Sequence, residues 1–132
     1  MTRTVDTRFF LTHFFGETED LRKKTEAKMF QLRRESAVVP TVVIHEVFKF
    51  VCQRIGKDSA KMVVDSILKG TFNVTPLDQD IAVTSGELRC EVPQVPTADA
   101  IIAATASAKK ALPVVTDDPH FRKLAGIRTE WL

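Results

Sequence analysis

The sequence predicts an α/β fold, a three-layer sandwich around a mostly parallel central sheet. Short runs rich in β-branched residues recur along the chain, and each is followed by a longer stretch in which apolar residues have helical spacing. Strands that alternate with helices favour parallel pairing, because the connecting helices cover the faces of the sheet. The chain has 132 residues, of which 44% are hydrophobic, enough for one domain with its own core. Without a repeat or a linker, residues 1–132 are expected to form a single domain.

The first half of the chain is expected to hold two strands and four helices. The expected elements are a strand at 4–5, helices over 7–15 and 17–34, a strand at 37–39, and helices over 41–55 and 59–68. Thr41 is a good N-cap for the third helix, and Gly56 is expected to end it. Asp58 or Ser59 is expected to cap the fourth helix.

The second half continues the alternation. The expected elements are a strand at 72–75, helices over 79–91 and 98–111, a strand at 113–116, a short helix from Asp118-Pro119, and a last strand at 127–131. Thr97 is expected to cap the alanine-rich helix. Pro119 suits the first position of the short helix, and Gly126 is expected to end that helix.

Composition and charge exclude few classes of function. The net charge of +2 is too small to establish nucleic-acid binding. Basic residues do cluster in one segment, which is more often a solvated helix face than a phosphate-contacting one: Arg22, Lys23, Lys24, Lys28, Arg33 and Arg34. The two cysteines, Cys52 and Cys90, form neither a disulfide framework nor a zinc motif, and Cys52 is expected to be a reduced core residue. No run is apolar enough for a membrane helix and no secretory signal is present, so a cytoplasmic location is expected.

Carboxylates set among core-like residues are the most informative feature. They are Asp6, Glu46, Asp99 and the adjacent Asp117 and Asp118. A carboxylate in such surroundings is costly unless a positive group meets it, and no matching set of lysines or arginines is nearby. Each also has an ordinary interpretation, because an aspartate is a common N-cap and favours the first turn of a helix. Together they indicate a site for a divalent cation.

Glu46 carries most of this interpretation. At 100° per residue, its helix face also holds Val42, Val43 and Phe50, so the carboxylate is expected to face inward. Pairing with Lys49 or Arg3 is the alternative, but an i,i+3 pair contributes only about 0.2–0.5 kcal/mol. Ligands that are all carboxylate suit Mg²⁺ or Mn²⁺, whereas zinc is disfavoured because no histidine shares a ligand spacing with a cysteine pair. His45 points about 100° away from Glu46 and is interpreted as a surface residue or a supporting neighbour.

The order and spacing of four segments resemble the PIN-domain family, in particular the VapC-type toxins of toxin–antitoxin pairs. The segments are Val5-Asp6-Thr7, residues 40–47, residues 98–106 and residues 115–121. The resemblance covers essentially the whole chain. It implies a PIN-like fold and an acidic cluster formed by Asp6, Glu46, Asp99 and one of the last pair, with the Thr-x-Asp pattern of Thr116 favouring Asp118 over Asp117.

The resemblance further implies metal-dependent hydrolysis of RNA. One or two Mg²⁺ or Mn²⁺ ions would be held by Asp6 and Asp99, with Glu46 and Asp118 completing the set. Thr116, Arg8 and Lys49 are the expected substrate-binding residues. The expected partners are the RNA substrate, a cognate antitoxin protein and a second copy of the chain in a homodimer.

Other functions remain to be compared with a nuclease. An aspartyl phosphatase would need an aspartate where Arg8 stands, and a receiver domain would need an acidic pair where Asp6 stands alone. The stronger alternative is a non-catalytic PIN-like module that binds RNA or protein. Four early phenylalanines, Phe9, Phe10, Phe14 and Phe15, exceed what one helix needs for a core, so they predict either core packing or an interface.

Overall fold

A five-stranded, all-parallel sheet forms the middle layer of the computed structural model, which describes residues 2–132. The strands are short and lie in the order β3-β2-β1-β4-β5. Their bounds are Thr4–Val5 for β1, Val38–Pro40 for β2, Asn73–Thr75 for β3, Val114–Val115 for β4 and Thr129–Glu130 for β5. The predicted α/β sandwich is confirmed.

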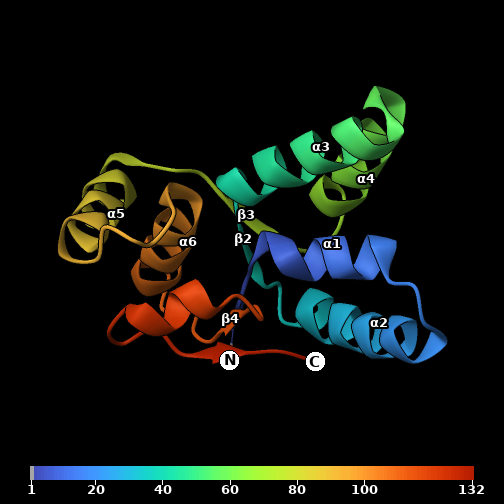
Figure 1. The fold of residues 1–132 in the computed structure, drawn as a ribbon. Helices are drawn as coiled ribbons and strands as arrows, with labels where there is room; N and C mark the ends of the chain where they lie inside the picture. The colour runs from blue at the N-terminus through green and yellow to red at the C-terminus, as the bar shows by residue number, and fades with distance from the viewer. Residues whose placement is uncertain (1) are drawn as a thin grey trace.

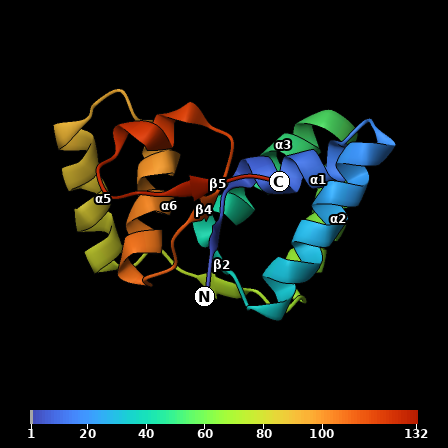
Figure 2. The same cartoon turned by 90° about the horizontal axis from the view of Figure 1, so that it is seen from below.

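Helices cover both faces of this sheet (Figures 1 and 2). They are α1 (Thr7–Phe15), α2 (Glu19–Arg34), α3 (Thr41–Ile55), α4 (Lys57–Leu68), α5 (Gln79–Glu91), α6 (Thr97–Ala108) and a 3₁₀ helix, η1 (Pro119–Lys123). Helices α5 and α6 pack together on one side, whereas α1 and α2 lie on the other (Figure 1). Helix α3 leaves the sheet after β2 and packs along α4. None of the described helices is long and apolar enough to span a membrane.

Three capping predictions differ from the structure. Pro40 and Pro96, not Thr41 and Thr97, are the N-caps of α3 and α6, and neither threonine makes a capping hydrogen bond. Each proline has an extended backbone and offers its carbonyl to the first turn, so the following threonine is already helical. Gly56 ends α3 as predicted, but it also begins α4, ahead of Asp58 and Ser59.

Several predicted elements are longer than the observed ones. The alanine-rich helix ends at Ala108, and the predicted strands at 113–116 and 127–131 shrink to two residues each. Val114 and Val115 pair with β1 on one side and with β5 on the other. The flanking residues lie outside these two-residue strands.

The aromatic residues of α1 divide between the core and the surface. Phe9 and Phe10 are fully buried, and their rings pack edge-to-face at 5.7 Å between centroids. Phe14 and Phe15 are half-buried against the same core. Phe15 also meets Phe50 of α3 beneath the guanidinium of Arg54. Core packing therefore accounts for the first two phenylalanines, while the other two remain partly accessible.

The order of the strands shows at which edge of the sheet a ligand site is expected. From β1 the chain proceeds to β2 and β3 on one side of the sheet, and then returns to β4 and β5 on the other side. In open parallel sheets, ligands bind at the carboxyl ends of the strands where the order reverses in this way. That point lies between β1 and β4, whose carboxyl ends lead into Asp6 and into residues 116–118.

Candidate active site

Asp6 is the innermost carboxylate of the site. It follows β1 directly and is only 2% exposed. Its Oδ1 accepts a hydrogen bond from the backbone N–H of Thr7 at 2.8 Å, so it caps α1, and its Oδ2 accepts one from the Thr116 hydroxyl at 2.6 Å. Burial raises the pKa of Asp6 to about 6, despite these two bonds, and the charges of Glu46 and Asp118 add to the increase. Asp6 can therefore cap α1 through Oδ1 while its Oδ2 lies on the side of Thr116 and the site.

Thr116 joins Asp6 to Asp118 across the reversal point of the sheet. Its hydroxyl donates to Asp6 and accepts a hydrogen bond from the backbone N–H of Asp118 at 2.9 Å. Both β1 and β4 therefore present a carboxylate at the same edge, with one buried threonine between them. This contact gives the predicted substrate-binding threonine an observed role in orienting carboxylates.

Glu46 reaches the site from α3. Its Oε1 accepts a hydrogen bond from the Thr7 hydroxyl at 2.6 Å. Neither alternative partner holds it, since Arg3 pairs instead with Glu35 and Glu130. Glu46 is half-buried, whereas the neighbouring His45 is exposed, as the helical angle between them predicts.

Asp99 supplies the strongest sign that a cation belongs here. It lies in the first turn of α6, is 8% exposed, and its Oδ2 makes no hydrogen bond to any described residue. Burial, together with the charges of Asp6, Asp118 and Glu46, raises the pKa of Asp99 to about 7. The carboxylates predicted from four distant segments therefore act on one another.

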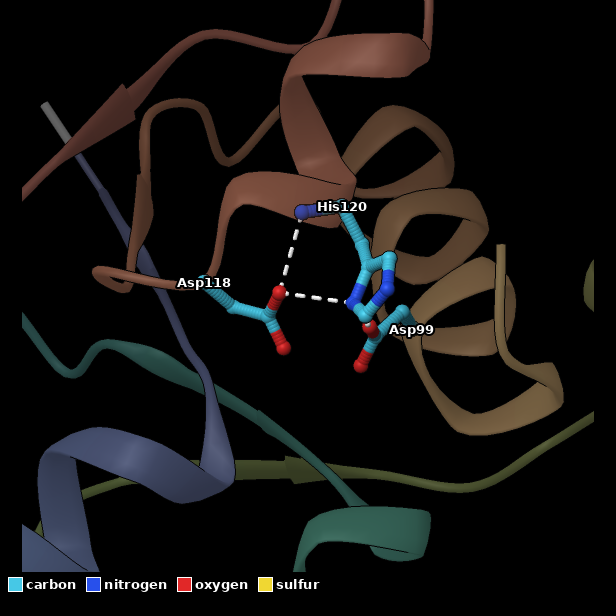
Figure 3. A group of neighbouring side chains, drawn as sticks. All are labelled: Asp99, Asp118 and His120. Carbon is cyan, nitrogen blue, oxygen red and sulfur yellow. Dashed lines mark hydrogen bonds and ion pairs between the residues drawn. The ribbon is translucent and has the colours of Figure 1, made fainter. Parts of the chain in front are cut away.

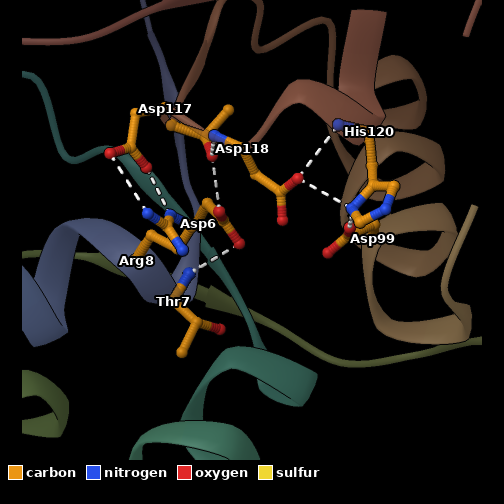
Figure 4. Close-up of polar contacts among 8 residues, drawn as sticks. Asp6, Thr7, Arg8, Asp99, Asp117, Asp118 and His120 are labelled. Carbon is orange, nitrogen blue, oxygen red and sulfur yellow. Dashed lines mark hydrogen bonds and ion pairs between the residues drawn. The ribbon is translucent and has the colours of Figure 1, made fainter. Parts of the chain in front are cut away.

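Asp117 and Asp118 have different surroundings. The Asp117 carboxylate is bound by the guanidinium of Arg8 through both of its oxygens, at the surface (Figure 4). Asp118 points toward Asp99 and caps η1 by accepting a hydrogen bond from the backbone N–H of His120 at 2.9 Å. Asp118 thus lies with the converging carboxylates, and Asp117 lies outside them.

His120 is a member of the cluster that sequence reasoning missed. Its Nδ1 lies 2.8 Å from Asp118 Oδ1 and 3.5 Å from Asp99 Oδ2, with no residue between them (Figure 3). The three side chains each offer a ligand atom, and these atoms all lie within 4.8 Å of one another. The available signal was the Asp-Pro-His spacing at a helix start, which turns residues 118 and 120 toward the same side.

A cavity of about 360 Å³ opens beside Glu46, between α1, α3 and α6. Its apolar lining includes Leu11, Val42, Phe50 and Ile101. Thr7, His45, Glu46 and Lys49 supply polar groups to the same lining. Of the predicted substrate-binding residues, Lys49 therefore borders the cavity. Arg8 pairs with Asp117 and lines a neighbouring hollow that shares Leu11 and Phe50 with this cavity.

The donor set fits a hard divalent cation. Four carboxylates converge at an edge where one buried oxygen lacks a partner, and carboxylate oxygens are the ligands that Mg²⁺ and Mn²⁺ prefer. No lysine or arginine pairs with Asp6, Glu46, Asp99 or Asp118 in the described structure. A cation would offset the cost of burial and the mutual repulsion that together raise the pKa values of Asp6 and Asp99.

Solved structures with this fold include several toxin–antitoxin complexes. VapBC2 from Rickettsia felis, bound to a promoter DNA fragment, has a TM-score of 0.78 and 19% identity over 100% of this chain and 99% of that one. DNA-bound VapBC from Salmonella typhimurium has a TM-score of 0.77 and 22% identity, covering 99% and 98%. VapC20 from Mycobacterium tuberculosis, described as a sarcin-ricin loop cleaving toxin, has a TM-score of 0.73 and 20% identity, covering 96% of each chain.

At these identities the solved structures establish the fold alone. No curated protein sequence matches the chain. A family model does match, however: that of the PIN domain, over residues 4–127, from β1 to the segment that precedes β5. This span includes every carboxylate of the site. The chain therefore belongs to the PIN-domain family.

Proposed function

We propose that this chain is a metal-dependent ribonuclease that hydrolyses RNA phosphodiester bonds and serves as the toxin of a toxin–antitoxin pair. The observation that carries the proposal is the buried Oδ2 of Asp99, which makes no hydrogen bond and lies 3.5 Å from Nδ1 of His120 within the cluster. A protein with no use for a cation would gain stability by replacing that carboxylate with an apolar residue. Family membership supports the same chemistry.

The residues divide by the atoms they present. Asp6 and Asp99 would hold one or two Mg²⁺ or Mn²⁺ ions, with Glu46 and Asp118 completing or orienting the set. Such an ion, when bound, lowers the pKa of water and stabilises the charge on the leaving oxygen. The Thr116 and Thr7 hydroxyls fix the directions in which Asp6 and Glu46 point, because each donates a short hydrogen bond to one carboxylate oxygen.

Arg8 and Lys49 are the proposed contacts to the RNA backbone. Lys49 is exposed and borders the cavity next to Glu46, so its ammonium could reach a phosphate at the cluster. Arg8 is more than half exposed despite its pair with Asp117, and an exposed pair of this kind contributes little stability. Exchanging Asp117 for a phosphate would therefore cost little.

An antitoxin and a second copy of the chain are the proposed protein partners. The cavity joins an apolar floor to an acidic end, so a partner segment with apolar and basic side chains would complement both. Phe14 and Phe15 are the remaining aromatic candidates for a homodimer contact, because Phe9 and Phe10 are fully buried within the chain. The described relatives in toxin–antitoxin complexes agree with an antitoxin partner.

The substitution Asp6→Asn tests the ribonuclease. It keeps the shape of the side chain but removes the charge that would hold the ion, so RNA cleavage in Mn²⁺ or Mg²⁺ should fall by roughly a hundredfold or more. Cleavage of a labelled RNA is the measurement, with circular dichroism to show that the variant is folded. Asp78→Asn is the matched control, since Asp78 is also an N-cap aspartate, at α5, and should retain full activity. Full activity of Asp6→Asn would reject the assignment.

The non-catalytic module makes a different prediction. A binding module has no need of a cation, so calorimetric titration of the wild-type protein should then show no Mn²⁺ binding up to millimolar concentration. Mn²⁺ binding that is lost in Asp6→Asn and kept in Asp78→Asn would favour the nuclease. RNA binding without cleavage, and without any metal requirement, would favour the module.

A further inference from the structure

We propose that His120 is a nitrogen ligand of the divalent ion at Asp99 and Asp118, and that it makes this end of the cluster prefer Mn²⁺ to Mg²⁺. The inference deepens the proposed function, because it rests on metal binding at the same carboxylates. It concerns which atoms hold the ion and is independent of whether RNA is cleaved. Figure 3 shows the imidazole ring turned toward the two carboxylates.

The Nδ1 edge of the His120 ring is buried, although much of the side chain is exposed. The side chain as a whole is 39% exposed, yet its Nδ1 atom is buried and makes no aligned hydrogen bond. Nδ1 instead lies 2.8 Å from Asp118 Oδ1 and 3.5 Å from Asp99 Oδ2, and the latter oxygen is also buried without a hydrogen bond. Two unpartnered, buried polar atoms from α6 and η1 therefore face each other.

Neighbouring ligands of an octahedral ion lie close together. At a metal–ligand distance of about 2.1 Å, adjacent donor atoms are about 3.0 Å apart. The observed separations of 2.8 and 3.5 Å bracket that value. An ion in this position would meet both unpartnered atoms together with the Asp118 carboxylate.

The local backbone keeps the ring in place. Asp118 Oδ1 accepts a hydrogen bond from the backbone N–H of His120, and Pro119 at the start of η1 restricts the turn between them. Because the two side chains leave the same tight turn, the imidazole Nδ1 remains 2.8 Å from the Asp118 carboxylate. Such restraint is what a ligand pair needs before the ion arrives.

Nδ1 of His120 can lie this close to two carboxylate oxygens when either its own hydrogen or a metal ion lies between them. The two possibilities differ in what removal of the ring does. A ligand nitrogen strengthens metal binding, whereas a bridging proton competes with the metal. Mg²⁺ keeps oxygen ligands and gives up its bound waters reluctantly, whereas the transition metal Mn²⁺ accepts an imidazole nitrogen more readily, so a nitrogen ligand should strengthen Mn²⁺ binding selectively.

The test is metal binding by the intact chain, with His120→Gln as the variant and His45→Gln as the control. Gln keeps a polar side chain at the turn but removes the imidazole, and His45 is an exposed histidine on α3. In calorimetric titrations, His120→Gln should weaken Mn²⁺ binding by about tenfold or more and leave Mg²⁺ binding within about threefold. His45→Gln should match the wild type for both ions.

A spectroscopic measurement identifies the ligand directly. Electron spin echo envelope modulation of the Mn²⁺-loaded wild type should show coupling to an imidazole ¹⁴N, which His120→Gln abolishes and His45→Gln retains. Absence of that coupling in the wild type, or Mn²⁺ binding that is unchanged or tighter in His120→Gln, would overturn the inference in favour of the bridging proton. Equal weakening of Mn²⁺ and Mg²⁺ would also overturn it.

The outcome is separable from that of the proposed ribonuclease. Imidazole coupling in a protein that cleaves no RNA supports the ligand and rejects the enzyme. Metal-dependent RNA cleavage without imidazole coupling supports the enzyme and rejects the ligand. The two measurements therefore fail independently.

Discussion

Adjacent residues in this chain have opposite roles because the backbone turns between them. Asp117 points outward to Arg8, whereas the Asp118 carboxylate accepts a hydrogen bond from the backbone N–H of His120 within the turn and points toward Asp99. Thr116 directs Asp118, and not Asp117, into the cluster. Its hydroxyl accepts a hydrogen bond from the backbone N–H of Asp118 and donates one to Asp6. A single buried hydroxyl thus positions two carboxylates from different strands.

Replacing Thr116 by valine should separate this positioning role from general stability. The change removes the donor to Asp6 and the acceptor for Asp118, so it should lower the free energy of unfolding by about 1–3 kcal/mol. Misplaced carboxylates should also weaken Mn²⁺ binding by about 10–100-fold. Urea unfolding and calorimetric titration are the measurements.

Thr4→Val is the matched control for this variant. Thr4 is fully buried, and its hydroxyl donates to the Ala111 carbonyl, so its loss should lower stability comparably. Mn²⁺ affinity should stay at the wild-type value. If both variants weakened metal binding equally, the effect would be one of stability and the positioning role of Thr116 would be rejected.

At the scale of elements, the basic helix α2 divides into free and engaged side chains. Lys28 is largely buried and pairs with Glu130, which also receives a hydrogen bond from Arg3 at 2.7 Å. This cluster ties α2 to β5 and to the start of β1. Burial raises the pKa of Glu130, but the hydrogen bonds from Lys28 and Arg3 outweigh that effect and hold the pKa below its usual value. Lys28 is therefore engaged in holding the fold together, unlike the solvated part of the helix.

Lys28→Met should destabilise the protein without affecting RNA binding. Loss of a partly buried, charged hydrogen bond should lower the free energy of unfolding by about 1–2 kcal/mol at neutral pH. Because the folded pKa of Glu130 is depressed, this contribution should disappear as the pH falls through that pKa. Urea unfolding at neutral and acid pH measures both effects.

Lys23→Met provides the comparison on the same helix. Lys23 is exposed and forms no ion pair among the described residues, so its replacement should leave stability unchanged. Weaker RNA binding by Lys28→Met than by Lys23→Met, at equal stability, would instead place Lys28 in an RNA-contacting surface.

For the molecule as a whole, the acidic cluster makes stability depend on pH and metal together. The pKa of Asp99 is about 7 in the folded protein and has an ordinary value of 3.8. The folded state thus binds more protons between these values, and Asp99 destabilises it progressively as the pH rises from about 4 to about 7. A divalent ion that meets the ionised carboxylates should reverse this loss.

Asp99→Asn should therefore be more stable than the wild type when metal is absent. The difference in the free energy of unfolding should grow as the pH rises through this range, because only the wild type must ionise the buried carboxyl of Asp99. Saturating Mn²⁺ should reverse the order, since the variant has lost a ligand. Urea unfolding at several pH values, with chelator or with Mn²⁺, checks both statements. A metal-free variant less stable than the wild type at pH 8 would contradict them.

Local sequence alone predicted the fold class, and it indicated most of the residues of the candidate site. Alternating strands and helices place Asp6 and residues 116–118 at the carboxyl edge of a parallel sheet, and helical periodicity turns Glu46 inward. These signals depend on neighbours within a few residues, so they can be read along the chain. Hydrophobic periodicity does not show the exact ends of helices and short strands, because neighbouring residues compete for the terminal positions. The caps Pro40 and Pro96 and the ends of the two-residue strands were therefore not predicted.

Only the tertiary structure decided between Asp117 and Asp118 and brought His120 to Asp99. Both outcomes depend on contacts between residues far apart in the chain: Arg8 with Asp117, Thr116 with Asp6, and α6 with η1. The direction of a side chain after a turn depends on which partner groups the facing element places near it. The local sequence does not show where those partner groups lie. Electrostatic repulsion within the cluster likewise exists only once the fold has brought distant carboxylates together.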